Sequence, residues 1–528
     1  MKKHISKWLC LLLTFCLFFT SCSEEERIFY YHVSSVPQNL DPQVASTPEE
    51  LSVISGLFDG LFSLDANGTP VLQAAESYEI SASGLVYTIH LKQNLFYRFQ
   101  VTTNSENPPA PIPVTAHDYV FGMQRVFTPE TRSPHATTLS AIENSARVLN
   151  GADPSVLGIK ALDDYTLQIT LSYPDASFLE ALTCAGAMPC NREFFESTRG
   201  AYGLSRENLI CNGPYNLRTW NDYDGVTLIA VDENAPVTRI RLPLLSEDTT
   251  SLSLLKNKAT DACILPYSEH PANLSGYHST SVNTTTWVLI FNPNSPGLNN
   301  RLIRQALGGI AQVAVEDMHL PEGFTVATGL VPPSVHISGT SYREMVGAAI
   351  YTPSIFSAQS SFSTGLSAES LDKLNNIRIL VVENSSTSLV ADMVNQNWQK
   401  NLSAFFAIDT MPLPDIITAM RRGDFDIALI PVSAFSNDIY ALLLPYSESG
   451  TYYWIGENNT AFNEALFPLS YTVQNREPLY LQAERALLSD YVICPLMYED
   501  SYFITSDWLK DVYISPFGPL IDFHSFVI

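Results

Sequence analysis

Short runs of alternating apolar and polar residues are spread along the first half of the chain. Alternation with a period of two is typical of strands with one buried face, and it predicts strands at 29–34, 85–91, 165–171, 226–231 and 240–245. Pro243 moves the last of these towards a sheet edge, because proline cannot donate to a strand ladder. Helical spacing predicts a helix over 49–61, closed by Gly60, and another over 116–126 with Thr115 as its N-cap.

A clearer pattern begins near residue 377, where strands and helices alternate. The apolar runs predict strands at 377–383, 405–411 and 425–430, with helices at 389–401 and 414–422 between them. This order is typical of an α/β unit. Two polar stretches interrupt the elements: the Pro-rich 98–114 predicts a loop, and the Ser-rich 354–370 predicts a surface excursion.

The composition indicates a folded, acidic protein with several domains. The 528 residues are enough for about three domains. Hydrophobic residues make up 46% and charged residues 16%, which excludes intrinsic disorder, because disordered chains are poor in apolar residues. The formal net charge of -25 at pH 7 repels a phosphate backbone, so the sequence argues against nucleic-acid binding.

The first residues have the pattern of a bacterial export signal. Lysines within 1–7 precede an apolar stretch at 8–20, which is shorter than the roughly 20 residues that span a bilayer. The segment 19–22 (FTSC) resembles a bacterial lipobox, although Leu is usual where Phe stands here. We therefore expect 1–21 to be a lipoprotein signal peptide and Cys22 to carry the lipid anchor. The alternative is an ordinary secretory signal cleaved nearby, with Cys22 incidental.

The cysteine pattern fits an exported protein but leaves the pairing open. Five cysteines follow Cys22, namely Cys184, Cys190, Cys211, Cys263 and Cys494. An odd number leaves at least one thiol unpaired unless it bonds between chains. The spacing of the first two does not match a zinc ribbon. One disulfide among the first three and buried free thiols are both compatible with the sequence.

No enzyme signature is present in the sequence. The HExxH, GxSxG and GxxxxGK[ST] patterns and the Rossmann glycine fingerprint are all missing, and the 10 histidines are scattered without ligand spacing. We therefore expect a protein that is not an enzyme, with no catalytic residues, no cofactor and no metal site. The 25 Tyr and 27 Phe suit a binding site lined by aromatic rings, although any single ring is better explained as core.

Several short motifs follow one another along the chain. The most specific are PVTAHDYV (113–120) and NGPY (212–215). The others are LDP (40–42), LFDGL (57–61), YTIHL (87–91), ALDDYTLQITLSYP (161–174), FN (291–292), RQAL (304–307), GDFDIA (423–428) and ICPL (493–496). In this order they resemble the bacterial extracellular solute-binding proteins of family 5, which include the oligopeptide- and dipeptide-binding proteins of ABC importers. The stretch 188–204 looks like versions found in Firmicutes.

The resemblance implies an α/β fold of the periplasmic-binding-protein-like type II, with two lobes joined by a hinge, an inserted subdomain and a ligand cleft between the lobes. Mapped onto this chain, lobe I would comprise 28–60, 212–290 and 500–528, the inserted subdomain 61–211, and lobe II 291–499. Asn212 and Gly213 are expected where the chain crosses between lobes, with Gly213 supplying an unusual backbone angle.

The resemblance also implies a function. The protein would be an extracytoplasmic lipoprotein that captures a peptide or peptide-like solute in a closing cleft. It would deliver this solute to the permease and ATPase subunits of an ABC importer, as a monomer anchored through Cys22 to the outer face of the cell membrane. Two alternatives keep the fold: a binding protein for a non-peptide solute, such as a metal chelate or an oligosaccharide, and a surface sensor or adhesin.

In the oligopeptide-binding members the ligand is held largely through its backbone, as an added strand. The positions that match their contact residues are Ser46, Thr47, Pro48, His135, Val432, Ser433, Ala434 and Phe435. His135 stands where those proteins have a Tyr that hydrogen-bonds the ligand. The alternative for His135 is a plain histidine on a surface loop.

One departure from the family pattern bears on the ligand. The oligopeptide binders carry a Trp followed three residues later by an Asp that pairs with the amino terminus of the peptide, and here these positions are Val432 and Phe435. Either the ligand is capped, cyclic, apolar or non-peptidic at that end, or another acid takes over. The candidate acids are Glu49, Glu50, Asp438 and Glu499.

Overall fold

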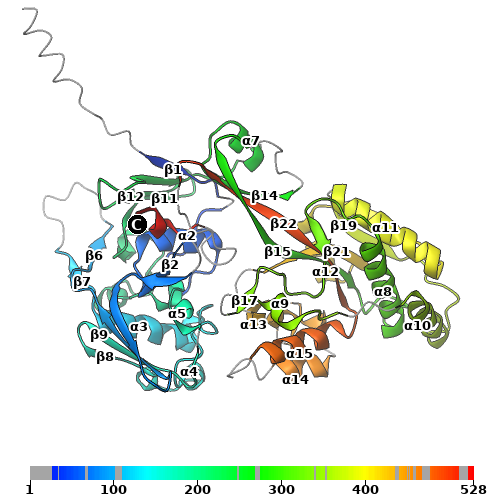
Figure 1. Cartoon of the computed structure of the whole chain (residues 1–528), viewed down its shortest axis with the longest axis horizontal. Coiled ribbons are helices and arrows are strands. Elements are labelled where there is room, and N and C mark those ends of the chain that lie inside the picture. The colour runs from blue at the N-terminus through cyan, green and yellow to red at the C-terminus, as the bar shows by residue number, and fades with distance from the viewer. Residues whose placement is uncertain are drawn as a thin grey trace, which may run out of the picture.

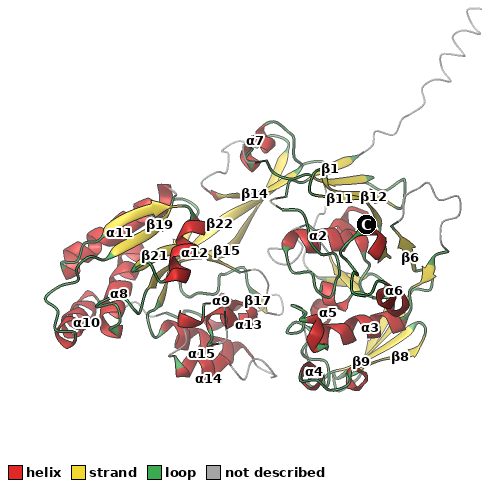
Figure 2. Cartoon of the chain, turned by 180° about the vertical axis from the view of Figure 1, so that it is seen from behind, coloured by secondary structure: helices red, strands yellow, loops and turns green. Residues whose placement is uncertain are grey.

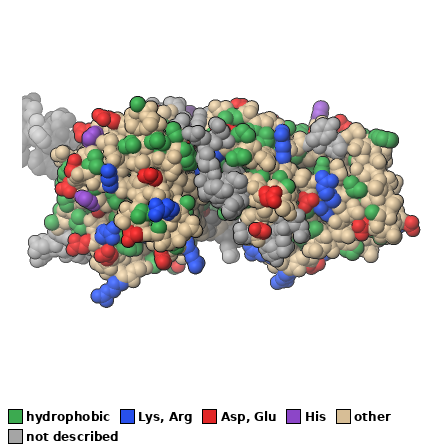
Figure 3. Space-filling view, turned by 90° about the horizontal axis from the view of Figure 1, so that it is seen from below, with side chains coloured by type: hydrophobic (Ala, Val, Ile, Leu, Met, Phe, Trp, Pro, Cys, Tyr) green, Lys and Arg blue, Asp and Glu red, His purple; other side chains and the backbone are tan. Residues whose placement is uncertain are grey.

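A computed structural model shows two lobes side by side, joined along one side by long strands (Figure 1). The structure describes residues 27–33, 35–65, 69–100, 110–175, 177–246, 249–267, 274–337, 340–350, 354–383, 385–434, 439–448, 450, 452–455, 459–466, 476–509 and 521–527. Within these ranges no helix is both long and apolar enough to cross a membrane. Acidic and basic side chains are interspersed over the face shown in Figure 3.

The first lobe contains a four-stranded sheet. Its strands, in spatial order, are β1 (Ile28–Tyr30), β13 (Arg239–Leu242), β12 (Gly225–Ala230) and β11 (Tyr215–Asn221). β1 is parallel to β13 and the other pairs are antiparallel. Helix α2 (Pro48–Leu57) packs on the same core as the short C-terminal helix η9 (Phe523–Val527). The Phe523 N–H donates to Ser55 Oγ at 2.9 Å, so segments near both ends of the chain build this core.

A second, antiparallel sheet lies in the same half of the molecule (Figure 1). Its order is β4 (Ala75–Ile80), β5 (Val86–Leu91), β9 (Thr166–Thr170) and β8 (Ile159–Asp163). Helix α3 (Ala116–Phe127) shares its core, and the predicted cap is confirmed, because Asp118 Oδ2 accepts from the Thr115 N–H at 2.7 Å. The smaller elements are β2 (Phe62–Leu64), β3 (Pro70–Leu72), β6 (Phe96–Phe99), β7 (Ile112–Pro113), β10 (Ile210–Cys211), α4 (Ser145–Leu149), α5 (Phe178–Ala181) and α6 (Arg192–Ser197).

A seven-stranded mixed sheet forms the centre of the second lobe. Its order is β14 (Ala262–Pro266), β22 (Ile493–Ser506), β15 (Tyr277–Phe291), β21 (Ile427–Ser433), β19 (Arg378–Val382) and β20 (Ala407–Met411), with β16 (Phe324–Val326) also paired to β22. The predicted α/β unit is confirmed, because β19 is parallel to both β20 and β21.

Helices cover both faces of this sheet, each with its own apolar core. One face carries α8 (Arg301–Asp317), α10 (Ile355–Ala368) and α11 (Ser385–Leu402). The other carries α9 (Tyr342–Val346), α12 (Leu413–Arg422), α13 (Ile439–Leu443), α14 (Thr460–Leu466) and α15 (Arg476–Leu488). The structure also contains α7 (Ser251–Lys256), a hairpin of β17 (His336–Ile337) and β18 (Thr340–Ser341), and several short 3-10 helices.

The long strands β15 and β22 connect the two lobes (Figure 1). β14, which pairs with β22, is tied to the first lobe by the bridge between Tyr31 and Ala262. Asn212 and Gly213, expected at the crossing between lobes, instead join β10 to β11. Gly213 is needed there for close approach rather than for its backbone angle, because a Cβ would lie 2.5 Å from the backbone of Leu57.

Two other expectations are wrong. The helix predicted over 49–61 ends at Leu57, because Asn212 Oδ1 accepts from the Asp59 N–H at 3.2 Å while Phe58 is already extended. The Ser-rich stretch expected as a surface excursion forms α10, whose buried Ala358, Phe362 and Gly365 share one face. The alternatives for the five cysteines are also decided, because the structure has all five as thiols and none in a disulfide.

Candidate functional site

The segment 41–48 follows the first strand of the chain and runs into the start of α2, and it carries the first predicted contact residues. Its start is fixed by a buried ion pair, in which Arg125 on α3 donates to both carboxylate oxygens of Asp41, with 3.0 Å between Nη1 and Oδ1. Arg125 Nη1 also donates to Gln43 Oε1 at 2.7 Å. The guanidinium lies 4.0 Å from the centroid of the Phe195 ring. These contacts lock the segment to α3 in one geometry.

The predicted contact residues Ser46, Thr47 and Pro48 form the N-terminal cap of α2. Thr47 Oγ1 accepts from the Glu50 N–H at 3.2 Å, and Pro48 occupies the first turn. In return, Glu50 Oε2 accepts from the N–H groups of Ser46 at 3.0 Å and Thr47 at 3.2 Å. The two amides are therefore already engaged, and a ligand would meet Ser46 through its carbonyl oxygen or its hydroxyl.

His135 lies directly behind this segment. Its side chain is buried, and Nε2 donates to the carbonyl oxygen of Ala45 at 3.0 Å. Burial lowers the pKa of His135 to about 4, so the imidazole is neutral at pH 7. A Cβ on Gly186 would lie 2.5 Å from the His135 Cβ, so only glycine fits beside it. His135 is thus buried rather than exposed on a surface loop, and its ring hydrogen-bonds the segment at Ala45, while its contact with a ligand stays a prediction.

The predicted contact run at 432–435 begins at the end of β21. Val432 and Ser433 pair with β15 on one edge, and the Ala434 N–H donates to Thr284 O at 2.9 Å. On the other edge, β19 pairs with β21 only as far as Leu429. Within the described residues, β21 beyond Leu429 therefore has one edge without a strand partner, which is the geometry that accepts an added strand. Phe435 lies outside the described residues.

Among the acids proposed to replace the missing anchor, Glu50 and Glu499 make hydrogen bonds within the protein. Glu50 holds the cap of α2. Glu499 on β22 accepts from Trp287 Nε1 at 2.7 Å and is buried, and burial raises its pKa. Glu49 lies in the first turn of α2, where a negative charge suits the helix N-terminus. Asp438 lies outside the described residues.

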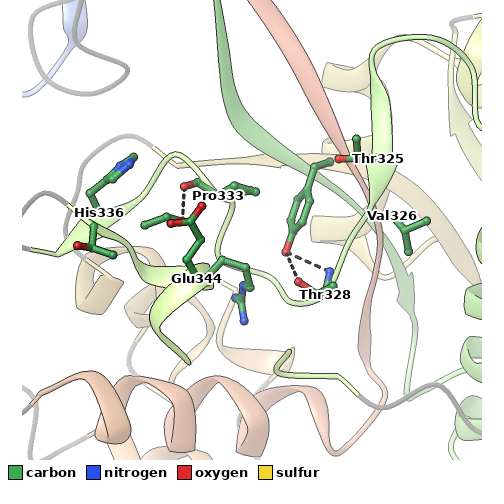
Figure 4. Close-up of a pocket in the computed structure, with 10 residues that line it drawn as sticks. Thr325, Val326, Thr328, Pro333, His336 and Glu344 are labelled. Carbon is green, nitrogen blue, oxygen red and sulfur yellow. Dashed lines mark hydrogen bonds between the residues drawn. The ribbon is translucent and has the colours of Figure 1, made fainter. Parts of the chain in front are cut away.

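A cavity of about 590 Å³ lies in the second lobe beside the joining strands (Figure 4). It is lined by Thr325, Val326, Thr328, Pro333, His336, Thr340, Ser341, Arg343, Glu344 and Tyr498. We call this cavity the lobe II pocket. Sequence reasoning missed it, because β22 approaches it from a point far along the chain from the other lining elements and no local motif marks it. Within the described residues, no group of His, Cys, Asp and Glu is arranged to hold a metal ion.

Two lobes joined by a strand hinge around a cleft define a solute-binding protein of the periplasmic type II class. The family described as bacterial extracellular solute-binding proteins, family 5, matches residues 69–454. Since this match covers most of the chain, the protein belongs to that family.

Relatives and solved structures agree over nearly the whole length. The chain is 26% identical over 492 residues to the probable deoxycholate-binding periplasmic protein YgiS of Escherichia coli, covering 90% of this chain and 88% of the relative. It is 23% identical over 518 residues to the periplasmic oligopeptide-binding protein OppA of the same organism, covering 92% and 89%. The structure of Listeria monocytogenes OppA bound to peptide has a TM-score of 0.69, with 23% identity and coverage of 96% and 99%. The likeness to this solved structure shows the fold.

Proposed function

We propose that this protein is the extracytoplasmic substrate-binding component of an ABC importer and that it captures a peptide or peptide-like solute between its lobes. The observation that carries this proposal is that β21 beyond Leu429 has one edge without a strand partner within the described residues, a geometry that accepts an added strand. The names of several relatives, including oligopeptide- and dipeptide-binding proteins, support a peptide as the ligand. The solute would then pass to the permease and ATPase subunits.

The proposal includes the predicted division of the chain and its contact residues. Lobe I would comprise 28–60, 212–290 and 500–528, the inserted subdomain 61–211, and lobe II 291–499. The two boundaries between lobes then fall within or next to the long strands β15 and β22. Ser46, Val432, Ser433, Ala434 and Phe435 would meet the ligand, while Thr47, Pro48 and His135 would hold the segment around Ser46.

The proposal also places the protein on the outer face of the cell membrane, anchored by lipid on Cys22. Cys22 lies outside the described residues, and the support is the FTSC pattern after an apolar export segment. Fatty-acid labelling should mark the wild type, and Cys22→Ser should be unlabelled and largely released from cells. Absence of label on the wild type would remove the anchor from the proposal.

A second candidate is a capped, apolar or non-peptide solute. Two observations favour it: the apolar Phe435 at the position of the family's acid, and a relative described as probably deoxycholate-binding. Ligand extraction from the purified protein, followed by mass spectrometry, separates the two candidates. Calorimetry on matched free-amine and N-acetylated peptides completes the test, because binding that requires the free amine would contradict a capped ligand. A sensor role would be favoured if deleting the gene left solute uptake unchanged.

A further inference from the structure

The lobe II pocket is lined by elements on the side of the second lobe that faces the first. It lies between β16, the β17–β18 hairpin, α9 and β22, and both Figures 1 and 2 place β17 and α9 on that side. Its volume of about 590 Å³ falls within the range of small-molecule sites, roughly 300–1,000 Å³. It is therefore large enough for a long side chain or a terminal group of a solute held in the cleft.

The pocket is linked to the end of β21 through β15, which pairs with the edge of β21 opposite the one that, among the described residues, lacks a strand partner beyond Leu429. The Ser334 hydroxyl, next to the lining residue Pro333, donates to the carbonyl oxygen of Asn283. The next carbonyl along β15, that of Thr284, accepts from the Ala434 N–H at 2.9 Å. The loop between β16 and β17, which contains Ser334, is also held to β15 by Thr286 Oγ1, which donates to Leu330 O at 2.8 Å. These contacts hold the loop that lines the pocket against β15, the strand that pairs with β21.

The positive charge in the pocket wall is already neutralised. Arg343 Nη2 donates to Glu484 Oε1 at 2.5 Å and to Val331 O at 3.1 Å, while Nη1 donates to Gly347 O at 2.9 Å. Arg343 is 8% exposed and Glu484 is fully buried. A buried ion pair with several hydrogen bonds stabilises the local structure and offers little net charge to a ligand.

Glu344 supplies the charge that remains. Its side chain is exposed, and within the described residues no ion pair or hydrogen bond engages its carboxylate. Figure 4 shows it between His336 and Thr328. The exposed hydroxyls of Thr325 and Thr340 line the same space and can accept further hydrogen bonds. The lining thus combines one uncompensated negative charge with several neutral oxygen acceptors.

We propose that the lobe II pocket is a subsite for a positively charged, hydrogen-bond-donating group of the bound solute, an ammonium or a guanidinium, with Glu344 as its charge partner. This rests on the proposed function, because it assumes a solute held in the cleft. It also provides an acid for a cationic group in a chain that has Phe435 where the family's acid is expected. A carboxylate meets either cation with charge-assisted hydrogen bonds.

The test uses calorimetry to compare the affinities of matched pentapeptides for the wild type and for Glu344→Gln. The peptides are identical except at one position, which holds lysine, norleucine or glutamate. Asp372→Asn is the matched control, because Asp372 is an exposed acid of the same lobe that follows α10 on the opposite face of the sheet. We expect the best lysine peptide to bind roughly tenfold more tightly than its norleucine counterpart in the wild type and in Asp372→Asn. In Glu344→Gln this preference should disappear while the norleucine peptide keeps its affinity.

The outcomes separate the subsite from the proposed function. Equal binding of lysine and norleucine peptides by the wild type, or a lysine preference that survives Glu344→Gln, overturns the subsite and leaves peptide capture standing. Failure of every peptide to bind, together with a non-peptide in the extracted ligand, overturns peptide capture and with it this inference. Thermal unfolding of Glu344→Gln at the wild-type temperature confirms that the variant is folded.

Discussion

At the scale of single residues, the segment predicted to contact the ligand is held by partners both near to it and remote from it in the sequence. Thr47, Pro48 and Glu50 carry a local signature, because a Thr followed by Pro and then Glu is a helix-capping pattern. His135 and Arg125 have no such signature, since their partners Ala45 and Asp41 are remote in sequence. The lobe II pocket was beyond prediction for the same reason.

The buried pair of Arg125 and Asp41 gives the first prediction. Arg125→Met should lower the free energy of unfolding by roughly 3–5 kcal/mol, because it leaves the Asp41 carboxylate buried without its cation. The double variant Arg125→Met/Asp41→Asn should recover a large part of this loss, since no buried charge remains. Urea unfolding of the wild type, the two single variants and the double variant measures these changes in the free energy of unfolding. A double variant no more stable than Arg125→Met would show that the charge is not the cause.

At the scale of elements, local patterns predicted the strands with one buried face and the α/β unit after 377. Local patterns failed to predict β15, because the first part of this strand is exposed and the last part is buried. No single period of apolar and polar residues therefore runs through it. Local patterns also failed for α10, whose Ser-rich composition has weak helix propensity. This helix depends on tertiary packing, in which a Cβ on Gly365 would lie 2.7 Å from Ile303 on α8.

The cap of α2 can be separated from the ligand contact by a matched pair of variants. Thr47→Ala removes the side chain that accepts from the Glu50 N–H, and Thr250→Ala removes the equivalent bond from the Ser253 N–H at the start of α7. Each should lower the free energy of unfolding by about 1 kcal/mol. Only Thr47→Ala should also weaken binding of the extracted ligand in calorimetry, because only that cap orients the predicted contact segment. Equal affinity of the two variants would contradict this role.

The packing of η9 on α2 brings titratable groups together, which predicts that the free energy of unfolding depends on pH. Burial raises the pKa of Asp59 to about 7, partly opposed by the Arg98 charge. His524 Nε2 lies 3.5 Å from Asp59 Oδ1, but burial lowers the pKa of His524 to about 4, so this contact is not an ion pair at pH 7. Burial also raises the pKa of the nearby Asp522 to about 6.

Asp59 thus has a folded-state pKa above its unfolded value of 3.8. Its contribution to stability is fully present below pH 3.8 and is lost as pH rises through about 7. Relative to Asp59→Asn, the wild type should lose up to about 1.4 kcal/mol of unfolding free energy per pH unit across this window. Urea unfolding of both proteins from pH 4 to pH 8 measures this difference, and parallel pH profiles would show that Asp59 is ionised throughout.

At the scale of the whole molecule, the arrangement of the lobes suits closure around a solute. Figure 1 shows the lobes joined along one side by β15 and β22. The parts of the two lobes that lie away from these strands face each other. The pairing of these strands shifts register between Val282 and Thr285, opposite Glu499 and Ser501. An irregularity in a strand pair bends it locally, so we expect the lobes to rotate about this point.

Closure on binding should reduce the radius of gyration measured by solution X-ray scattering when saturating extracted ligand is added. The physical reason is that a solute which contacts both lobes binds the closed state more tightly and therefore shifts the population towards it. A solute of similar size that calorimetry shows not to bind is the control for solvent contrast. Identical scattering curves with and without bound ligand would mean that the hinge does not move, and that the two lobes form a rigid scaffold for a partner to recognise.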